Sequence, residues 1–277
     1  MALLSACSFS LIQLAYNQAP NYVYWRVNKS FSLEPSQQTT ARGSIHDWFG
    51  WHRTTQLPVY ARFLTQAQAD AAGDITPALA CKRRDEMEVW LRAAIDRMAP
   101  SMARLANTLG PRQLDSLQDH FQSMNEDFQK DFLQSDPKER REALDEFAVK
   151  WIELFYGRFS DVQRKQVSED LAHLPFDAES FYQQRLRFQN NLLGTLRQLQ
   201  AQKATTAQTE QALKALMMDL VDPQDPKFKV EWQHWIAAGC QMSAAVHNRT
   251  SPTQRRHVIE LLQGWQPDLL ELAKDSS

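Results

Sequence analysis

Glycine is scarce in this sequence of 277 residues, with only eight occurrences. Tight β-hairpin turns depend on residues that tolerate positive φ, which is the usual role of glycine. Valine and isoleucine, which are typical of strands, together occur 18 times, whereas leucine occurs 31 times and glutamine 28 times. We therefore predict an all-α protein without a β-sheet, a multi-helix bundle of about 9–11 helices. Because the expected connections are short, sequential helices should pack mostly as antiparallel neighbours.

The spacing of glycines and histidines excludes several classes of enzyme. The closest glycines, Gly43 and Gly50, are seven residues apart, so G-x-G-x-x-G, the P-loop and G-x-S-x-G are all absent. No histidine is followed by glutamate, which excludes the H-E-x-x-H zinc motif. The cysteines are too far apart in sequence for a zinc knuckle. We expect no enzymatic activity, no cofactor and no bound metal.

Long apolar runs and a strong net charge are also missing. No run of 18 apolar residues occurs, so no segment is predicted to cross a membrane as a helix. The 31 basic and 33 acidic residues leave a net charge of −2, which creates no field that attracts nucleic acid. We therefore expect no nucleic-acid partner.

The first cysteine of the chain lies in a distinctive setting. Cys7 follows Leu4, Ser5 and Ala6, and this tetrapeptide has the form of the lipid-attachment box of bacterial lipoproteins. The residues before it are fewer than an export signal requires, so we interpret residues 1–6 as the remnant of a lipoprotein signal peptide. We predict lipidation of Cys7 and attachment to a membrane. The alternative is a chance tetrapeptide in a cytosolic protein.

Acylation of Cys7 would leave an even pair of cysteines. In an oxidising compartment such pairs persist as disulfides, and Cys81 and Cys240 each fall on a predicted helix. We predict a bridge between them, closing a loop of about 160 residues. Two unrelated buried thiols are the alternative.

The chain divides into an N-terminal segment and one large helical domain. Residues 7–30 form the lipid-anchored segment, in which Pro20 is expected to separate two short helices. Its apolar and aromatic residues could touch the bilayer interface, but we favour packing on the body of the protein. The helical domain comprises residues 31–277, with a possible subdivision near 203–208, and opens with a long helix over about 35–72.

Apolar side chains spaced by three and four predict a buried stripe on one later helix and an apolar stripe on another. The first helix begins at Pro77 after the N-cap Thr76, and the second begins at Pro137 after Asp136. The first stripe contains Met87, Leu91, Ile95, Met98, Met102, Leu105 and Leu109, and the second contains Leu144, Phe147, Trp151, Leu154 and Phe155.

The densest aromatic cluster of the chain surrounds Trp48. His46 and His52 are six residues apart, a poor spacing for two metal ligands on one helix face. Tryptophan and arginine dominate interface hot spots, so we predict that Trp48, Trp51, His52 and Arg53 contact a partner protein. The alternative places Trp48 and Trp51 in the core.

Four predicted helix starts share one layout, in which glutamine falls three residues after the N-cap. The glutamine side chain of such a capping box can accept a hydrogen bond from the N-cap N–H. These glutamines are Gln37, Gln113, Gln163 and Gln254.

Several stretches carry a resemblance to known families. They are Cys7 with Leu14–Gln18, Trp51-His52-Arg53 with Leu57-Pro58 and Tyr60, Phe155–Arg158, and His247-Asn248 with Thr250 and Pro252. With them the chain resembles an uncharacterised family of all-helical proteobacterial lipoproteins, a domain of unknown function. The glutamine starts give a weaker similarity to the Spy/CpxP periplasmic chaperones, whose motif is Leu-Thr-x-x-Gln. None of the four starts has both the leucine and the hydroxyl residue.

The lipoprotein resemblance implies an address and a helical fold without a known activity. Ser8, in place of a retaining aspartate after Cys7, implies the outer membrane, with the domain facing the periplasm. We expect a lipid-anchored binding module of the cell envelope, with the membrane and an envelope protein as partners. A periplasmic holdase-type chaperone is the alternative, and an enzyme without a recognisable motif is the third.

Overall fold

The computed structural model describes residues 10–175 and 178–274, a part of the chain that lacks Cys7 and residues 1–6. Within it the structure contains eleven α-helices, one π-helical segment and no strand, so the all-α prediction is confirmed. The elements are α1 (Leu11–Phe31), α2 (Pro35–Trp51), η1 (His52–Gln56), α3 (Leu57–Ala71), α4 (Pro77–Ala106), α5 (Pro111–Phe132), α6 (Pro137–Tyr156), α7 (Asp161–Ala172), α8 (Ala178–Ala201), α9 (Thr206–Asp219), α10 (Pro226–Asn248) and α11 (Pro252–Lys274).

Proline and short polar side chains mark the starts of the helices. Six helices begin at a proline, whose fixed φ suits the first helical position and whose missing N–H costs nothing there. The side chains of Thr76, Asp136 and Asp225 each accept a hydrogen bond from a backbone N–H of the first turn. The helix starts predicted at Pro77 and Pro137 are therefore confirmed.

The prediction that Pro20 separates two helices is wrong, because α1 continues through it. Proline removes only one backbone hydrogen bond, and packing of the rest of the helix outweighs that loss. Tyr24, one turn further on, is buried in the core, and the Arg42 guanidinium lies 3.5 Å from its ring centroid. At the other end, Ser10 caps the helix by accepting from the Gln13 N–H.

The long helix predicted over 35–72 is present, but its pitch changes near the middle. The Leu57 N–H donates to the His52 carbonyl five residues earlier, which makes η1 a π-helical turn between α2 and α3. Pro58, which has no N–H to donate, follows directly in the first turn of α3. The chain thus passes Pro58 without a break in the helix.

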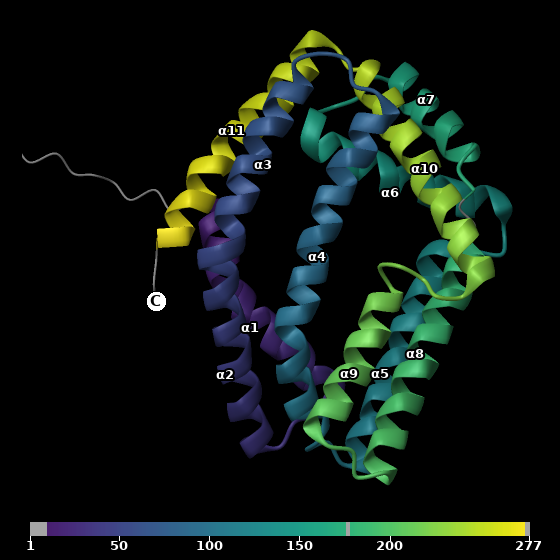
Figure 1. The fold of residues 1–277 in the computed structure, drawn as a ribbon. Helices are drawn as coiled ribbons and strands as arrows, with labels where there is room; N and C mark the ends of the chain where they lie inside the picture. The colour runs from purple at the N-terminus through teal and green to yellow at the C-terminus, as the bar shows by residue number, and fades with distance from the viewer. Residues whose placement is uncertain (1–9, 176–177, 275–277) are drawn as a thin grey trace, which may run out of the picture.

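Figure 1 shows α3 and α11 side by side along one edge of the molecule, while α4 runs through the middle and α5, α8 and α9 lie opposite. The most extensive contacts join helices far apart in sequence: α3 with α11, and α4 with α9 and α10. Sequential neighbours also pack, as α1 with α2 and α8 with α9 do, so the expected antiparallel neighbours describe only part of the packing. Residues 203–208 cover the turn from α8 to α9 and the start of α9.

Buried apolar side chains gather in three clusters. The largest joins α1, α2, α4, α5, α8 and α9, the second joins α6, α7 and α10, and the third joins α3 to α11. Representative members are Leu114 and Leu193 in the first, Phe159 and Val167 in the second, and Leu64 and Leu262 in the third.

The four glutamine starts, far apart in sequence, come together as two pairs. Gln37 and Gln113 exchange amide hydrogen bonds of 3.0 and 2.7 Å. Each also donates to a carbonyl of the opposite turn, Gln37 to that of Thr108 and Gln113 to that of Ser32. Since each glutamine also accepts from its own N-cap N–H, both amides are fully bonded although buried.

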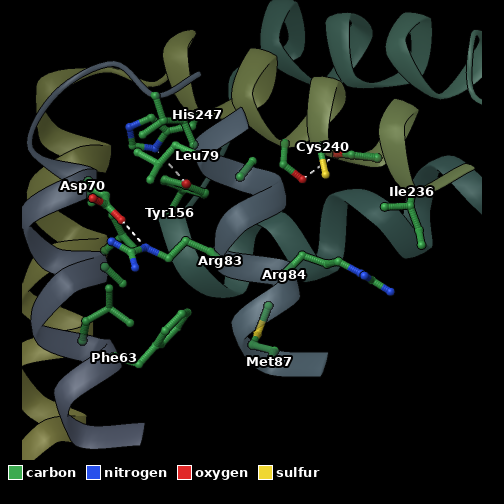
Figure 2. A pocket seen from close by; sticks show the side chains of 18 of the residues that line it. Phe63, Asp70, Leu79, Arg83, Arg84, Met87, Tyr156, Ile236, Cys240 and His247 are labelled. Carbon is green, nitrogen blue, oxygen red and sulfur yellow. Dashed lines mark hydrogen bonds and ion pairs between the residues drawn. The ribbon is translucent and has the colours of Figure 1, made fainter. Parts of the chain in front are cut away.

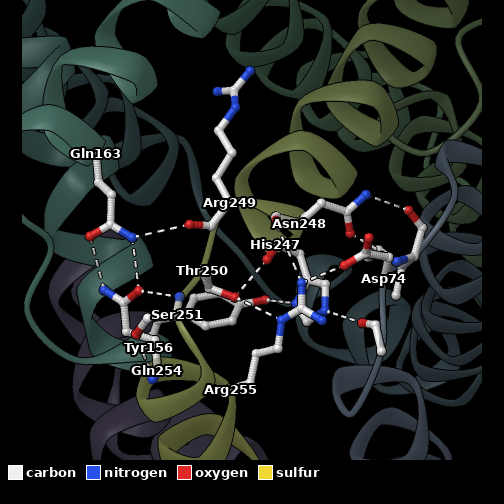
Figure 3. A network of polar contacts seen from close by, with 12 residues as sticks. Asp74, Tyr156, Gln163, His247, Asn248, Arg249, Thr250, Ser251, Gln254 and Arg255 are labelled. Atoms are coloured by element: carbon white, nitrogen blue, oxygen red, sulfur yellow. Dashed lines mark hydrogen bonds and ion pairs between the residues drawn. The ribbon is translucent and has the colours of Figure 1, made fainter.

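Gln163 and Gln254 form the second pair with the same pattern (Figure 3). Their amides exchange bonds of 2.8 and 3.2 Å, and they donate to the carbonyls of Arg249 and Arg158. The capping boxes therefore do more than start four helices. They fasten the α1–α2 turn to the α4–α5 turn, and the α6–α7 turn to the α10–α11 turn.

Candidate functional site

The predicted aromatic cluster surrounds the imidazole of His52, where α2 passes into η1. The ring stacks between Trp48, at a centroid distance of 4.8 Å, and Tyr16 of α1, at 5.8 Å. Tyr60 of α3 approaches the same ring edge-on at 5.4 Å. Aromatic contacts of this kind add to the burial of the rings, so His52 joins α1, α2 and α3.

Burial sets the protonation states of Tyr16 and His52. The Tyr16 hydroxyl lies 2.8 Å from the Nδ1 of His52. Burial raises the pKa of Tyr16 to about 12 and lowers the pKa of His52 to about 4. At neutral pH both the phenol and the imidazole are therefore neutral, and one hydrogen bond joins the Tyr16 hydroxyl to Nδ1 of His52.

Arg53 lies apart from the other three residues of the predicted contact patch. Trp48, Trp51 and His52 touch one another and are half-buried, with 5.8 Å between the two tryptophan ring centroids. Arg53 is only 8% exposed and donates to the Leu272 carbonyl at the end of α11 and to Asn17 of α1. Its guanidinium therefore joins two helices inside the protein.

An apolar pocket of about 450 Å³ lies beside Trp48, between α1, α2 and α4. Only Ser44, Ser101 and Trp48 bring side-chain nitrogen or oxygen to its wall, and the Trp48 indole N–H is engaged by the Ala94 carbonyl at 3.3 Å. The volume is within the range of ligand pockets. The lining residues are Val23, Val27, Ala41, Ser44, Ile45, Trp48, Phe49, Leu91, Ala94, Met98, Ser101, Met102 and Leu105.

The predicted buried stripe of α4 is only partly buried. Ile95 is 3% exposed, as expected, but Leu91 is 51% exposed and Met87 46% exposed. Leu91 lines the apolar pocket, and Met87 lines a second cavity on another side of α4. The apolar residues of α4 therefore line the two cavities as well as the core.

The second cavity, of about 470 Å³, lies between α3, α4 and α10. Figure 2 shows two pairs of its polar side chains directed at each other, while Arg84 points away from both pairs. Arg83 pairs with Asp70 at 2.6 Å, and the Tyr156 hydroxyl meets His247 at 2.9 Å. Arg83 is also paired with Glu86 of its own helix. These pairs connect α3 to α4 and α6 to α10 around the cavity.

A disulfide joins Cys81 of α4 to Cys240 of α10, with 5.3 Å between the Cα atoms. This is the pair predicted from the sequence, and Cys240 also lines the second cavity. Cys7, the predicted lipidation site, lies outside the described residues.

His247 is buried at the end of α10 (Figure 3). Its Nε2 faces the Gly73 carbonyl at 2.8 Å, so this nitrogen carries the proton, and Nδ1 accepts from Tyr156. The neighbouring Asn248 bonds both the N–H and the carbonyl of Ile75. These two side chains fix the turn before α4 against α10.

A continuous row of aromatic rings crosses α8, α5 and α6, and we call it the aromatic stripe. Phe147 and Trp151, on the predicted apolar stripe of α6, are 49% and 54% exposed. Exposed apolar surfaces of this kind often mark interaction sites. The stripe comprises Phe181, Tyr182, Phe128, Phe132, Phe147 and Trp151, with ring centroids 5.1–6.3 Å apart along the row.

In the part of the chain that the structure describes, no group of three histidine, cysteine or acidic side chains is placed to hold a metal ion. None of the helices in the described ranges combines the length and the apolar character that a bilayer crossing requires.

Residues 29–225, more than half of the chain, match a family of unknown function, DUF6279. The chain belongs to this family. The DUF6279 match includes the Gln37–Gln113 pair and most of the apolar pocket, and it ends just before α10. No curated protein and no solved structure matches the chain.

The lowered pKa of His52 predicts a loss of stability in acid. Between pH 6.5 and 4 the unfolded chain binds a proton at this position that the folded protein does not, so stability falls as the pH falls through that window. Allowing for the partial exposure of the ring, we expect a loss of about 2 kcal/mol by pH 4. Urea unfolding between pH 7.5 and 4 measures it.

His52→Gln should remove this part of the pH dependence. The control is His46→Gln, because the His46 side chain is 72% exposed. Equal pH profiles for wild type and His52→Gln would show that His52 does not titrate with a lowered pKa.

Proposed function

We propose that this DUF6279 protein is a lipid-anchored binding protein of the cell envelope, attached to the outer membrane and facing the periplasm. It binds apolar side chains of an envelope protein partner in the pocket between α1, α2 and α4. The observation that carries this proposal is the wall of that pocket, which offers almost no polar atoms and includes Trp48 from the predicted contact patch.

The lining residues suit a partner with irregular apolar groups. Met98 and Met102 are unbranched and can adapt their shape to an occupant. Trp48 is the type of residue that dominates binding energies at interfaces. Trp51 and His52 pack on Trp48 and hold it in position beside the pocket.

Two features support the proposed location. Cys7 follows the leucine and small residues of a lipid-attachment box. The disulfide between Cys81 and Cys240 suits an oxidising compartment such as the bacterial periplasm.

Titration with the apolar fluorophore N-phenyl-1-naphthylamine tests the pocket. We expect saturable binding to the wild type and a loss of affinity of at least about ten-fold in Ser44→Phe, because the added ring occupies space that the ligand needs. The matched control is Gly43→Phe on the same helix, since a Cβ at Gly43 meets nothing within 4 Å. If wild type and Ser44→Phe bind N-phenyl-1-naphthylamine with equal affinity, the ligand does not bind in this pocket.

The aromatic stripe favours a second candidate function, a holdase-type chaperone that covers apolar segments of unfolded proteins. Trp151 and Phe147 would contact such clients, because their rings are exposed on α6. Suppression of the aggregation of several unrelated proteins, lost in Trp151→Ser and retained in Ser44→Phe, would favour this candidate. No suppression of aggregation, together with a single saturable partner in a pull-down, would favour the binding protein.

A further inference from the structure

One face of α1 points away from the body of the protein. At about 100° per residue, its residues fall within about 80° of one another on the helical wheel. Leu11 is 84% exposed and Trp25 50% exposed, and the others on this face are exposed as well. The face consists of Leu11, Leu14, Gln18, Tyr22, Trp25 and Lys29.

The opposite face of α1 makes the contacts of this helix with the rest of the protein. Tyr24 is buried in the largest core cluster, Val23 and Val27 line the apolar pocket, and Tyr16 stacks on His52. Packing within the described residues thus explains one side of the helix. It leaves unexplained why leucine, tyrosine and tryptophan occupy the other side.

The residue types of the outward face are those of a membrane–water interface. Tryptophan and tyrosine concentrate at the headgroup level of bilayers, while leucine enters the acyl region. Tyr22 and Trp25 lie 5.9 Å apart, and the Lys29 ammonium is 5.3 Å from the Trp25 ring centroid. A lysine beside an aromatic ring can extend its charge to the lipid phosphates while its stem lies on apolar surface.

The charge of α1 agrees with an anionic surface. The helix contains Arg26 and Lys29 and no aspartate or glutamate. Phosphatidylglycerol and similar lipids attract cationic segments of this kind. A partner protein with an acidic apolar surface has the same complementarity, so the position of the helix in the chain decides between the two.

That position is next to the proposed lipid anchor. Leu11 is four residues after Cys7, and four residues of extended chain span at most about 14 Å. Any lipid on Cys7 therefore brings the first turn of α1 to the leaflet surface.

We infer that the outward face of α1 lies on the lipid leaflet and forms a second membrane contact beside the anchor. This inference rests on the proposed lipidation of Cys7. Both expectations for the N-terminal segment then apply, because one face of α1 packs on the protein body and the other is free to meet the bilayer interface.

Flotation with vesicles of phosphatidylethanolamine and phosphatidylglycerol tests the contact apart from the anchor. The parent protein is the full chain with Cys7→Ser, which cannot be acylated. We expect it to bind these vesicles, and Leu11→Gln with Trp25→Gln to lower the partition coefficient at least about ten-fold. Both side chains are exposed, so folding, checked by circular dichroism, should be unchanged.

The matched control changes two exposed apolar residues elsewhere, Trp151→Gln with Leu154→Gln on α6, and should bind vesicles like the parent. Equal partition of parent and α1 variant, or no vesicle binding by the parent, would overturn the inference. The anchor is tested separately, by intact-mass analysis of the wild-type protein from membranes. An unacylated Cys7 there would refute the lipid anchor, while the vesicle result would still decide whether α1 itself binds lipid.

Discussion

Removing the disulfide should lower the free energy of unfolding by about 3–5 kcal/mol. Cys81 and Cys240 are 159 residues apart in sequence, so the bridge restricts a very large loop of the unfolded chain. It also fixes α4, which runs through the middle of the molecule, to α10 (Figure 1). For a chain of this size the loss corresponds to a fall in melting temperature of roughly 10 °C.

The measurement is urea and thermal unfolding of the double variant Cys81→Ser with Cys240→Ser. Reducing agent should destabilise the wild type by a similar amount and leave the variant unchanged. If neither the reductant nor the substitution shifts the unfolding transition, the disulfide does not stabilise the fold as described.

Gln113→Ala should lower the free energy of unfolding by about 3 kcal/mol. The Gln113 amide accepts from the Gly110 N–H, exchanges two bonds with Gln37 and donates to the Ser32 carbonyl. Its side chain is 7% exposed, so alanine leaves several buried polar groups without partners. Each such group costs about 1–3 kcal/mol.

Gln208→Ala is the matched control, because Gln208 completes the capping box of α9 from an exposed position. We expect a cost of about 0.5 kcal/mol there. A double-mutant cycle with Gln37→Ala should be strongly non-additive, since the first substitution already breaks the pair. Similar costs for Gln113→Ala and Gln208→Ala would mean that the pairing adds nothing to capping.

The individual capping boxes could be predicted from the sequence, but their pairing could not. A helix start is encoded within a few residues, so Ser251 followed by Gln254 is recognisable locally. The partner of Gln254 is Gln163, 91 residues away, and only the packed arrangement of helices brings the two together. Local sequence signals therefore predict the helices of this fold, but they do not predict which helices pack against each other.

The apolar patterns were ambiguous for a related reason. Spacing by three and four shows that side chains share one face of a helix and leaves open what covers that face. Leu91 and Trp151 both belong to such stripes, yet one lines the apolar pocket and the other lies on the surface. Pro20 and Arg53 departed from local expectations, because packing of α1 outweighs a proline and buried partners hold the guanidinium.

Hydrogen–deuterium exchange of the full chain, with and without saturating N-phenyl-1-naphthylamine, tests the binding site most directly. The account predicts slower exchange in the parts of α1, α2 and α4 around Val27, Trp48 and Met98, and little change in α6 and α8. Protection confined to α5, α6 and α8, or no protection, would contradict the assignment of binding to the apolar pocket.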